Sequence, residues 1–328
     1  MTGWKLWTFV GIGFGCACLA LLSGNNYLLQ VFFRVALFAA LGLAWNLVGG
    51  YAGQLSLGHV AFFGMGAYGL AIFTAHHVPA WISIFLAAAF ATLIGGVIGK
   101  IVFRLRGPYF TLATIAFGEV LRLTAANLEI TGGAVGLSTP PLFTSNSVLS
   151  ITRHFYFSAL ILCLITFLVN YWTSRSRFGY YLMAIREDED TASAVGIDTA
   201  NYKLRSLLIS AFLTAIAGAL YASAFLYIVP DQVLTIEISV QMAVIAMLGG
   251  AGTLVGPIVG AVLLITASEL FKVRFGERHL LIYGSLIVIV VLFLPEGIVG
   301  SLQLRLRRQK RAPASAIAAA KTEAQGGS

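Results

Sequence analysis

Apolar residues gather along this chain in long blocks, and the charged residues stand mostly in the stretches between them. Many blocks reach about 20 residues, the length of a helix that crosses a bilayer. By this length rule, about ten blocks are predicted to span a membrane. They fall near residues 6–22, 28–48, 59–75, 81–103, 108–127, 155–172, 205–226, 238–250, 253–270 and 279–294.

Two glycine-rich stretches interrupt this pattern. The stretch at 51–59 is predicted to be non-helical, and such a segment is tolerated in a membrane only where protein covers it or where it lines a cavity. Its Gln54, Ser56 and His59 fit two roles: contact with a passing polar solute, or support for the free backbone groups of a broken helix. The stretch at 249–256 is predicted to bend the chain, which makes this region a candidate broken or re-entrant element.

The composition supports a membrane protein. Of the 328 residues, 59% are hydrophobic and only 10% are charged, and the mean hydropathy is +0.89. Soluble domains carry about a quarter charged residues, so this chain has too few to cover a surface in water. The sequence therefore predicts an all-α, polytopic transmembrane bundle of about ten spans with broken or re-entrant glycine-rich segments.

The distribution of positive charge predicts the orientation, because Lys and Arg are enriched in cytoplasmic loops. The segments 104–106, 173–203 and 305–311 are basic and fall on one side of the membrane, whereas the connection at 128–154 falls on the other. We therefore predict that both termini are cytoplasmic, although the basic residues at 272–278 fall on the opposite side. The net charge of +8 matches this topology, so membrane lipid is an expected partner and nucleic acid is not.

The two ends of the chain need separate interpretation. The block at 6–22 resembles a signal peptide, but no convincing cleavage site precedes Asn25, so we predict a retained first helix. The stretch at 304–328 is predicted to be a basic, disordered cytoplasmic tail. Residues 1–303 then form one transmembrane domain.

Charged residues inside the apolar blocks are candidates for function, because a charge in lipid is costly unless a partner or water faces it. Glu119 and Arg122 have the i, i+3 spacing of a pair on one helix face. The pair is either a self-neutralising structural contact or part of a translocation pathway. Arg34 is predicted to extend its guanidinium toward the membrane surface.

The longest charged segment between blocks lies at 174–203. We predict one helix from Tyr180 to Val195, because this stretch lacks glycine and proline and is rich in helix formers. An ordinary solvated loop is the alternative. Connections between helices are usually short, so a helix here favours a docking surface for a cytoplasmic partner.

No enzymatic constellation is found in the sequence. It contains no P-loop and no Rossmann fingerprint, and its histidines and cysteines lack the spacing of a metal site. We therefore expect no enzyme and no cofactor or metal bound by this chain. Any use of ATP would require a separate subunit.

Several of these segments together resemble the LivM-type permeases of ABC importers for branched-chain amino acids. The resemblance runs in order along nearly the whole chain, to about residue 303. It rests on the runs GYAGQLSLGHVAFFGMGAY (50–68), RGPYFTLATIAFGEVLRL (106–123), TGGAVGL (131–137), RFGYYLMAIREDEDTASAVGID (177–198), MLGGAGTLVGPIVGA (247–261) and FLPEGIVG (293–300).

The resemblance implies a permease subunit of the bacterial inner membrane that imports branched-chain amino acids. It also implies partners: a second homologous permease subunit, two cytoplasmic ATPase subunits that use ATP, and a periplasmic solute-binding protein. The segment near 180–197 would be the coupling helix that contacts the ATPases. The implied ATPase contacts are Arg186, Glu187, Asp188, Glu189, Asp190, Ala194 and Gly196, and the candidates for the translocation pathway are Gln54, Ser56, His59, Glu119 and Arg122.

Two other functions remain open on the sequence alone. A related permease for urea, short-chain amides or aromatic acids shares the same motifs, because the solute-binding protein selects the substrate. A secondary transporter driven by a proton or sodium gradient would use Glu119 as its relay. That second function leaves the charged segment at 174–203 without a role.

Overall fold

The computed structural model describes residues 24–143, 145, 147–276, 284–285 and 297–299. The predicted block at 6–22, nearly all of the block at 279–294 and the tail at 304–328 lie outside the described residues. In the described part of the chain, the secondary structure is almost entirely helical, as the sequence predicts.

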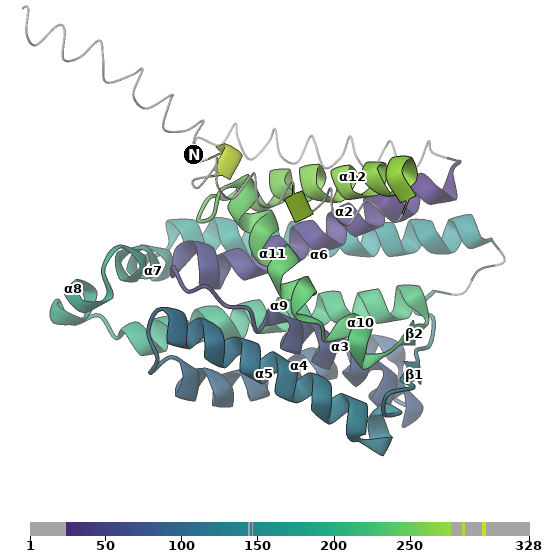
Figure 1. Cartoon of the computed structure of the whole chain (residues 1–328), viewed down its shortest axis with the longest axis horizontal. Helices are drawn as coiled ribbons and strands as arrows, with labels where there is room; N and C mark the ends of the chain where they lie inside the picture. The colour runs from purple at the N-terminus through teal and green to yellow at the C-terminus, as the bar shows by residue number, and fades with distance from the viewer. Residues whose placement is uncertain (1–23, 144, 146, 277–283, 286–296, 300–328) are drawn as a thin grey trace, which may run out of the picture.

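Long helices lie side by side and form the bulk of the described molecule (Figure 1). Within the described residues, five helical segments are long and apolar enough to cross a membrane. This supports a multi-pass protein but does not confirm the predicted number of about ten spans. These segments are Asn26–Tyr51, Ala80–Val102, Val148–Arg175, Thr199–Phe225 and Pro230–Gly249. The long helices are α2 (Asn26–Trp45), α3 (His59–Ala75), α4 (Ala80–Val102), α5 (Pro108–Asn127), α6 (Val148–Arg175), α9 (Thr199–Phe225), α11 (Ile236–Gly249) and α12 (Gly256–Phe275).

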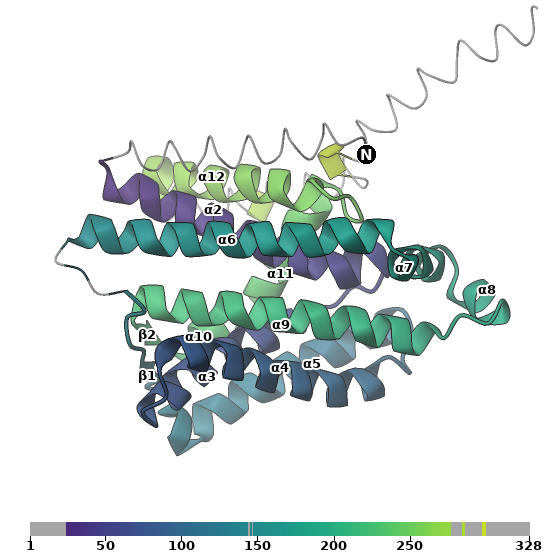
Figure 2. The same ribbon diagram turned by 180° about the vertical axis from the view of Figure 1, so that it is seen from behind.

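Short elements mark the two ends of the bundle. A small antiparallel pair of strands, in which Leu137 lies opposite Ile228, stands at one end, and α7 and α8 project from the opposite end (Figure 2). The two ends of the bundle therefore carry different elements. The short elements are the π-helix η1 (Asn46–Tyr51), the 3-10 helix η2 (Glu129–Thr131), α7 (Arg177–Glu187), α8 (Glu189–Ala194), α10 (Pro230–Val233), β1 (Leu137–Ser138) and β2 (Tyr227–Ile228).

Small residues let α3 and α9 approach closely. A Cβ on Gly66 of α3 would overlap the carbonyl of Ala215, and a Cβ on Gly218 of α9 would overlap the carbonyl of Phe63. Close backbone approach at small residues is a main source of helix association in lipid. Gly66 and Gly218 therefore set the close contact between the two helices.

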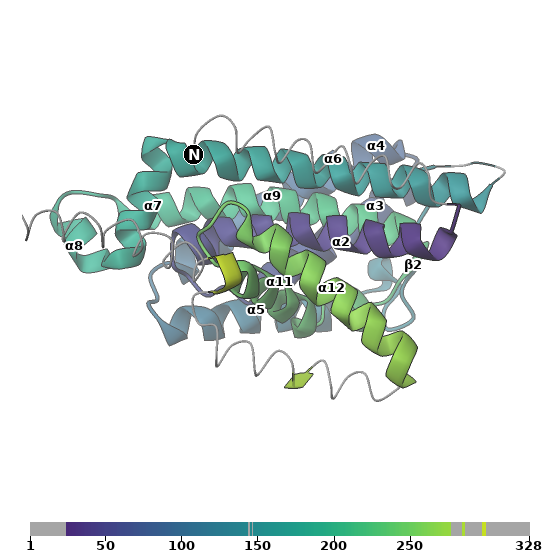
Figure 3. The same cartoon turned by 90° about the horizontal axis from the view of Figure 1, so that it is seen from above.

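The predicted bend at 249–256 is also confirmed. Helix α11 ends at Gly249 and α12 begins at Gly256, and α12 then runs beside α2 and α11 (Figure 3). Between the helices, Gly250 and Gly252 adopt φ angles of 120° and 79°. Backbone in this region favours glycine because a side chain would be strained there.

Candidate functional site

The end of α2 is unwound, and one buried side chain organises it. The helix passes into η1, and the chain then runs without helix through residues 52–58, here called the first loop. Asn46 donates to the Thr253 carbonyl at 3.1 Å and accepts from the Gly252 amide at 2.8 Å. These bonds join the unwound end of α2 to residues 250–255, here called the second loop. Protein therefore satisfies backbone groups that lipid cannot.

His59 is fully buried between two serine hydroxyls. Its Nδ1 lies 2.9 Å from Ser56 Oγ, and its Nε2 lies 2.9 Å from Ser210 Oγ in α9. Ser210 in turn donates to the Ala44 carbonyl at 2.6 Å, near the end of α2. Ser56 is buried as well, whereas Gln54 is partly exposed. This geometry fits the support of a broken helix, and the pathway role of these residues stays a prediction.

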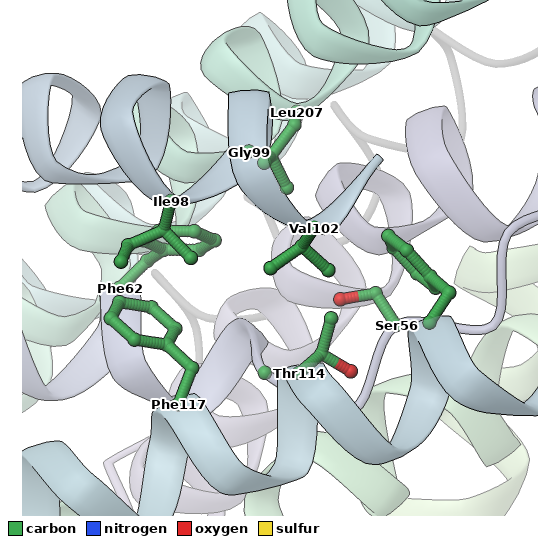
Figure 4. A pocket seen from close by; sticks show the side chains of 10 residues that line it. Ser56, Phe62, Ile98, Gly99, Val102, Thr114, Phe117 and Leu207 are labelled. Carbon is green, nitrogen blue, oxygen red and sulfur yellow. The ribbon is translucent and has the colours of Figure 1, made fainter. Parts of the chain in front are cut away.

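A small cavity adjoins Ser56 (Figure 4). Its volume is about 20 Å³, and its walls include Val102, Thr114 and Phe117. A cavity needs a volume of roughly 10–15 Å³ to hold one water molecule. The cavity therefore has room for a water molecule but not for an amino acid.

Arg186, at the end of α7, reaches both loops. Its Nη1 donates to the Gly50 carbonyl at 2.7 Å and lies 3.5 Å from the Ala251 carbonyl. The first loop passes so close that a Cβ on Gly53 would lie 2.8 Å from Arg186 Cγ. A charged group that donates to carbonyls forms stronger hydrogen bonds than a neutral one. Arg186 thus links α7 to the unwound end of α2.

The predicted single helix from Tyr180 to Val195 is wrong in detail, because the chain forms α7 and α8 with a break at Asp188. Asp188 has extended backbone angles, and its carboxylate accepts from the Thr191 amide at 2.6 Å. This is the geometry of a helix N-cap. The hydrogen bond from the Thr191 amide holds the pKa of the Asp188 carboxyl below its usual range.

Two further carboxylates fasten α8 to the bundle. Glu189 pairs at 2.6 Å with Lys203 of α9, whose side chain is fully buried. Asp190 pairs at 2.5 Å with Arg106, in the connection between α4 and α5, and this hydrogen bond raises the pKa of the Arg106 guanidinium. The predicted ATPase contacts therefore divide into residues that hold the segment in place and residues that it presents outward. The outward group is Glu187, Ala194 and Gly196, which are exposed.

The predicted pairing of Glu119 with Arg122 is confirmed, and a third residue joins it. Arg122 donates through Nε and Nη2 to Glu119, at 3.0 and 2.5 Å, and through Nη1 to Asp231 at 2.5 Å. Asp231 belongs to α10, so the cluster joins α5 to α10. Sequence spacing did not reveal Asp231 because it is 109 positions from Arg122.

The expectation that Arg34 extends toward the membrane surface stays a prediction, and the structure adds a partner for its charge. The guanidinium forms an ion pair with Glu269 of α12, and the Tyr27 hydroxyl donates to the same carboxylate at 3.2 Å. A charge among apolar helices is stabilised by a partner, and the partner here is 235 positions away. The pair ties α12 to α2.

The described helices include several apolar spans, and buried polar groups hold the unwound end of α2. These features define a multi-pass membrane protein. A family described as "Branched-chain amino acid transport system / permease component" matches residues 27–294. The chain belongs to this family.

Curated relatives give the same result. The chain is 31% identical to the high-affinity branched-chain amino acid transport system permease protein LivM of Salmonella typhimurium, over 80% of the chain and 67% of LivM. It is 30% identical to the LivM protein of Escherichia coli K12 over the same shares. It is 24% identical to the permease protein LivH of Salmonella typhimurium, over 84% of the chain and 96% of LivH.

Proposed function

We propose that this chain is the permease subunit of an ABC importer that carries branched-chain amino acids across the bacterial inner membrane. Separate subunits would hydrolyse the ATP, and the chain itself would bind no cofactor. The LivM and LivH relatives are named for branched-chain amino acids, which favours these substrates over urea, amides or aromatic acids. Arg122 pairs with both Glu119 and Asp231, and this ion pairing disfavours a proton relay at the Glu119 carboxylate.

The observation that carries the proposal is the construction of the α7–α8 segment, residues 177–194. Leu182 and Ile185 of α7 are buried in the bundle. Arg186 donates to the Gly50 carbonyl of η1 and lies near the Ala251 carbonyl of the second loop. Beyond this anchored side, α8 projects from the end of the molecule with Val195 74% exposed beside acidic residues. An apolar side chain presented in this way fits a protein partner. A movement of α8 imposed by an ATPase would be transmitted through α7 and Arg186 to the unwound end of α2.

A second permease subunit is proposed to cover α5. This helix buries only Phe110, Thr114, Gly118 and Ala125, which form one narrow stripe. Its other faces are apolar and exposed; Tyr109, for example, is 71% exposed. Lipid can cover apolar side chains, but the ion cluster of Arg122 requires water or protein. A homologous subunit facing α5 would place a polar path between the two chains.

The proposed topology has about ten spans, with both termini and α8 in the cytoplasm. The end of the bundle with β1, β2 and α10 would then face the periplasm and receive substrate from the solute-binding protein. The basic stretch at 305–311 supports this orientation, since cytoplasmic segments carry the excess of Lys and Arg.

Co-purification tests the ATPase contact. We would express the chain with its second permease and ATPase subunits and compare the wild type with the double variant Glu187→Lys, Val195→Asp. We expect the wild type to retain the ATPases and the double variant to lose at least about nine-tenths of them, because the two changes remove outward contacts only. Thr191→Ala serves as a control in α8, since its amide, which caps the helix, is unchanged. Retention of the ATPases by the double variant would contradict the proposed docking surface.

A further inference from the structure

A large apolar cavity lies between α3, α4 and α5. Its volume is about 350 Å³, and its walls are mostly apolar, among them Met65, Phe73, Phe90, Leu121 and Leu234. An engineered apolar cavity of roughly 150 Å³ suffices to bind benzene. A branched aliphatic side chain therefore fits within this space, and apolar walls suit it because its burial is favourable.

One polar group in this wall has no partner. Tyr68 lines the cavity, is 5% exposed, and its buried hydroxyl has no hydrogen-bond partner within the described residues. An unsatisfied buried hydroxyl costs roughly 1–3 kcal/mol. A ligand with a polar end and an apolar body would satisfy the hydroxyl while its body fills the cavity.

The residues of the ion cluster are close in sequence to residues that line this cavity, although none of the three is itself part of its wall. On α5, Leu121 and Ala125 line the cavity and Arg122 stands between them in sequence; on the neighbouring segment, Asp231 precedes the lining residue Leu234 by three positions. Three of the five N–H donors of Arg122 are used by Glu119 and Asp231. One donor on each Nη remains, which is the arrangement that binds a carboxylate through two hydrogen bonds.

The charge of the cluster suits the other end of an amino acid. Two carboxylates, Glu119 and Asp231, face one guanidinium, so the cluster carries one surplus negative charge. This surplus attracts an ammonium group, while the carboxylate of the same amino acid would be bound by Arg122. The cluster thus offers donors to a carboxylate and acceptors to an ammonium within one small region.

We propose that the cavity and the adjoining ion cluster form a transit site for a branched-chain amino acid on its way through the permease. The aliphatic side chain occupies the cavity, Arg122 binds the carboxylate, Glu119 and Asp231 bind the ammonium, and the Tyr68 hydroxyl completes the polar contacts. Figure 1 shows α10 beside the strand pair at one end of the bundle, and Asp231 of the site belongs to α10. The inference rests on the proposed function, in which this end receives the substrate.

The test is a measurement of maximal transport rates in the complete complex, reconstituted in proteoliposomes with saturating binding protein loaded with valine or leucine. When the loaded binding protein is saturating, the transport rates no longer depend on its affinity for valine or leucine. Ala125→Leu narrows the cavity, and we expect it to raise the ratio of valine to leucine rates about tenfold, the discrimination that one methylene confers in a fitted pocket. Ala89→Leu, the same change at an exposed position of α4 that does not line the cavity, is the matched control.

Tyr68→Phe separates a substrate contact from a structural role. If the hydroxyl binds substrate, both rates fall about fivefold while the thermal midpoint of the complex stays or rises, since a buried unsatisfied hydroxyl is removed. An unchanged valine-to-leucine ratio in Ala125→Leu with full rates in Tyr68→Phe would overturn the transit site and assign the cavity to packing or a lipid chain. A wild-type complex that transports neither amino acid would instead contradict the proposed function itself.

Discussion

Arg186 differs from the other charged residues of the α7–α8 segment in the direction of its contacts. Its guanidinium holds the Gly50 carbonyl in η1 and lies near the Ala251 carbonyl of the second loop. Glu187, one position later, is exposed. Adjacent residues thus differ in their surroundings: Arg186 contacts the bundle, and Glu187 is exposed. The resemblance alone assigned both to ATPase contact.

This division predicts distinct effects of substitution at Arg186. Arg186→Gln should keep the ATPases bound but reduce the stimulation of ATP hydrolysis by loaded binding protein about tenfold, because a charged hydrogen bond to the loops is lost. The measurement is ATPase activity of the reconstituted complex, alongside co-purification. Arg177→Gln, at the exposed start of α7, is the control. Loss of the ATPases in Arg186→Gln would place Arg186 in the docking surface after all.

At the scale of elements, local patterns predicted the breaks, and long-range partners escaped prediction. The breaks at 51–59 and 249–256 follow from glycine, which local sequence displays. The division between α7 and α8 also had a local signal, since Asp188 precedes Thr191 with N-cap spacing. Glu269 and Asp231 had no such signal, because their arginine partners lie more than a hundred positions away. Residue spacing gives contacts within a helix and not contacts between helices.

The capping role of Asp188 predicts a pH dependence confined to α8. Its pKa is lowered in the folded state, so the cap stabilises α8 above the ordinary aspartate range, and this stabilisation is lost as the pH falls through the lowered value. The protection of residues 189–194 against hydrogen exchange, measured relative to the intrinsic rate at each pH, should therefore fall in acid. Asp188→Ala should quicken the exchange about fivefold at neutral pH, whereas Asp188→Asn, which still caps, should show little change. Equal exchange in Asp188→Ala and the wild type would show that the cap does not hold α8.

At the scale of the whole molecule, the described bundle has two different ends. One carries α7 and α8, fastened by Arg186, by the Glu189–Lys203 pair and by the Asp190–Arg106 pair. The other carries α10, the strand pair and the ion cluster of Arg122 beside the apolar cavity. The first suits a partner that supplies force, and the second suits a substrate with charged and aliphatic parts. A permease driven by ATP requires both a surface for the partner that supplies force and a site for the substrate. ATP shifts the permease between two packed arrangements only if it favours one of them.

The most direct test is leucine uptake into proteoliposomes that hold this chain with its second permease and ATPase subunits, with loaded binding protein outside. The account predicts uptake that requires hydrolysable ATP at the ATPases and falls at least about tenfold when a non-hydrolysable analogue replaces ATP. A parallel preparation of this chain without ATPases, given an imposed proton or sodium gradient, should show none. Gradient-driven uptake by that second preparation would contradict the account and identify a secondary transporter.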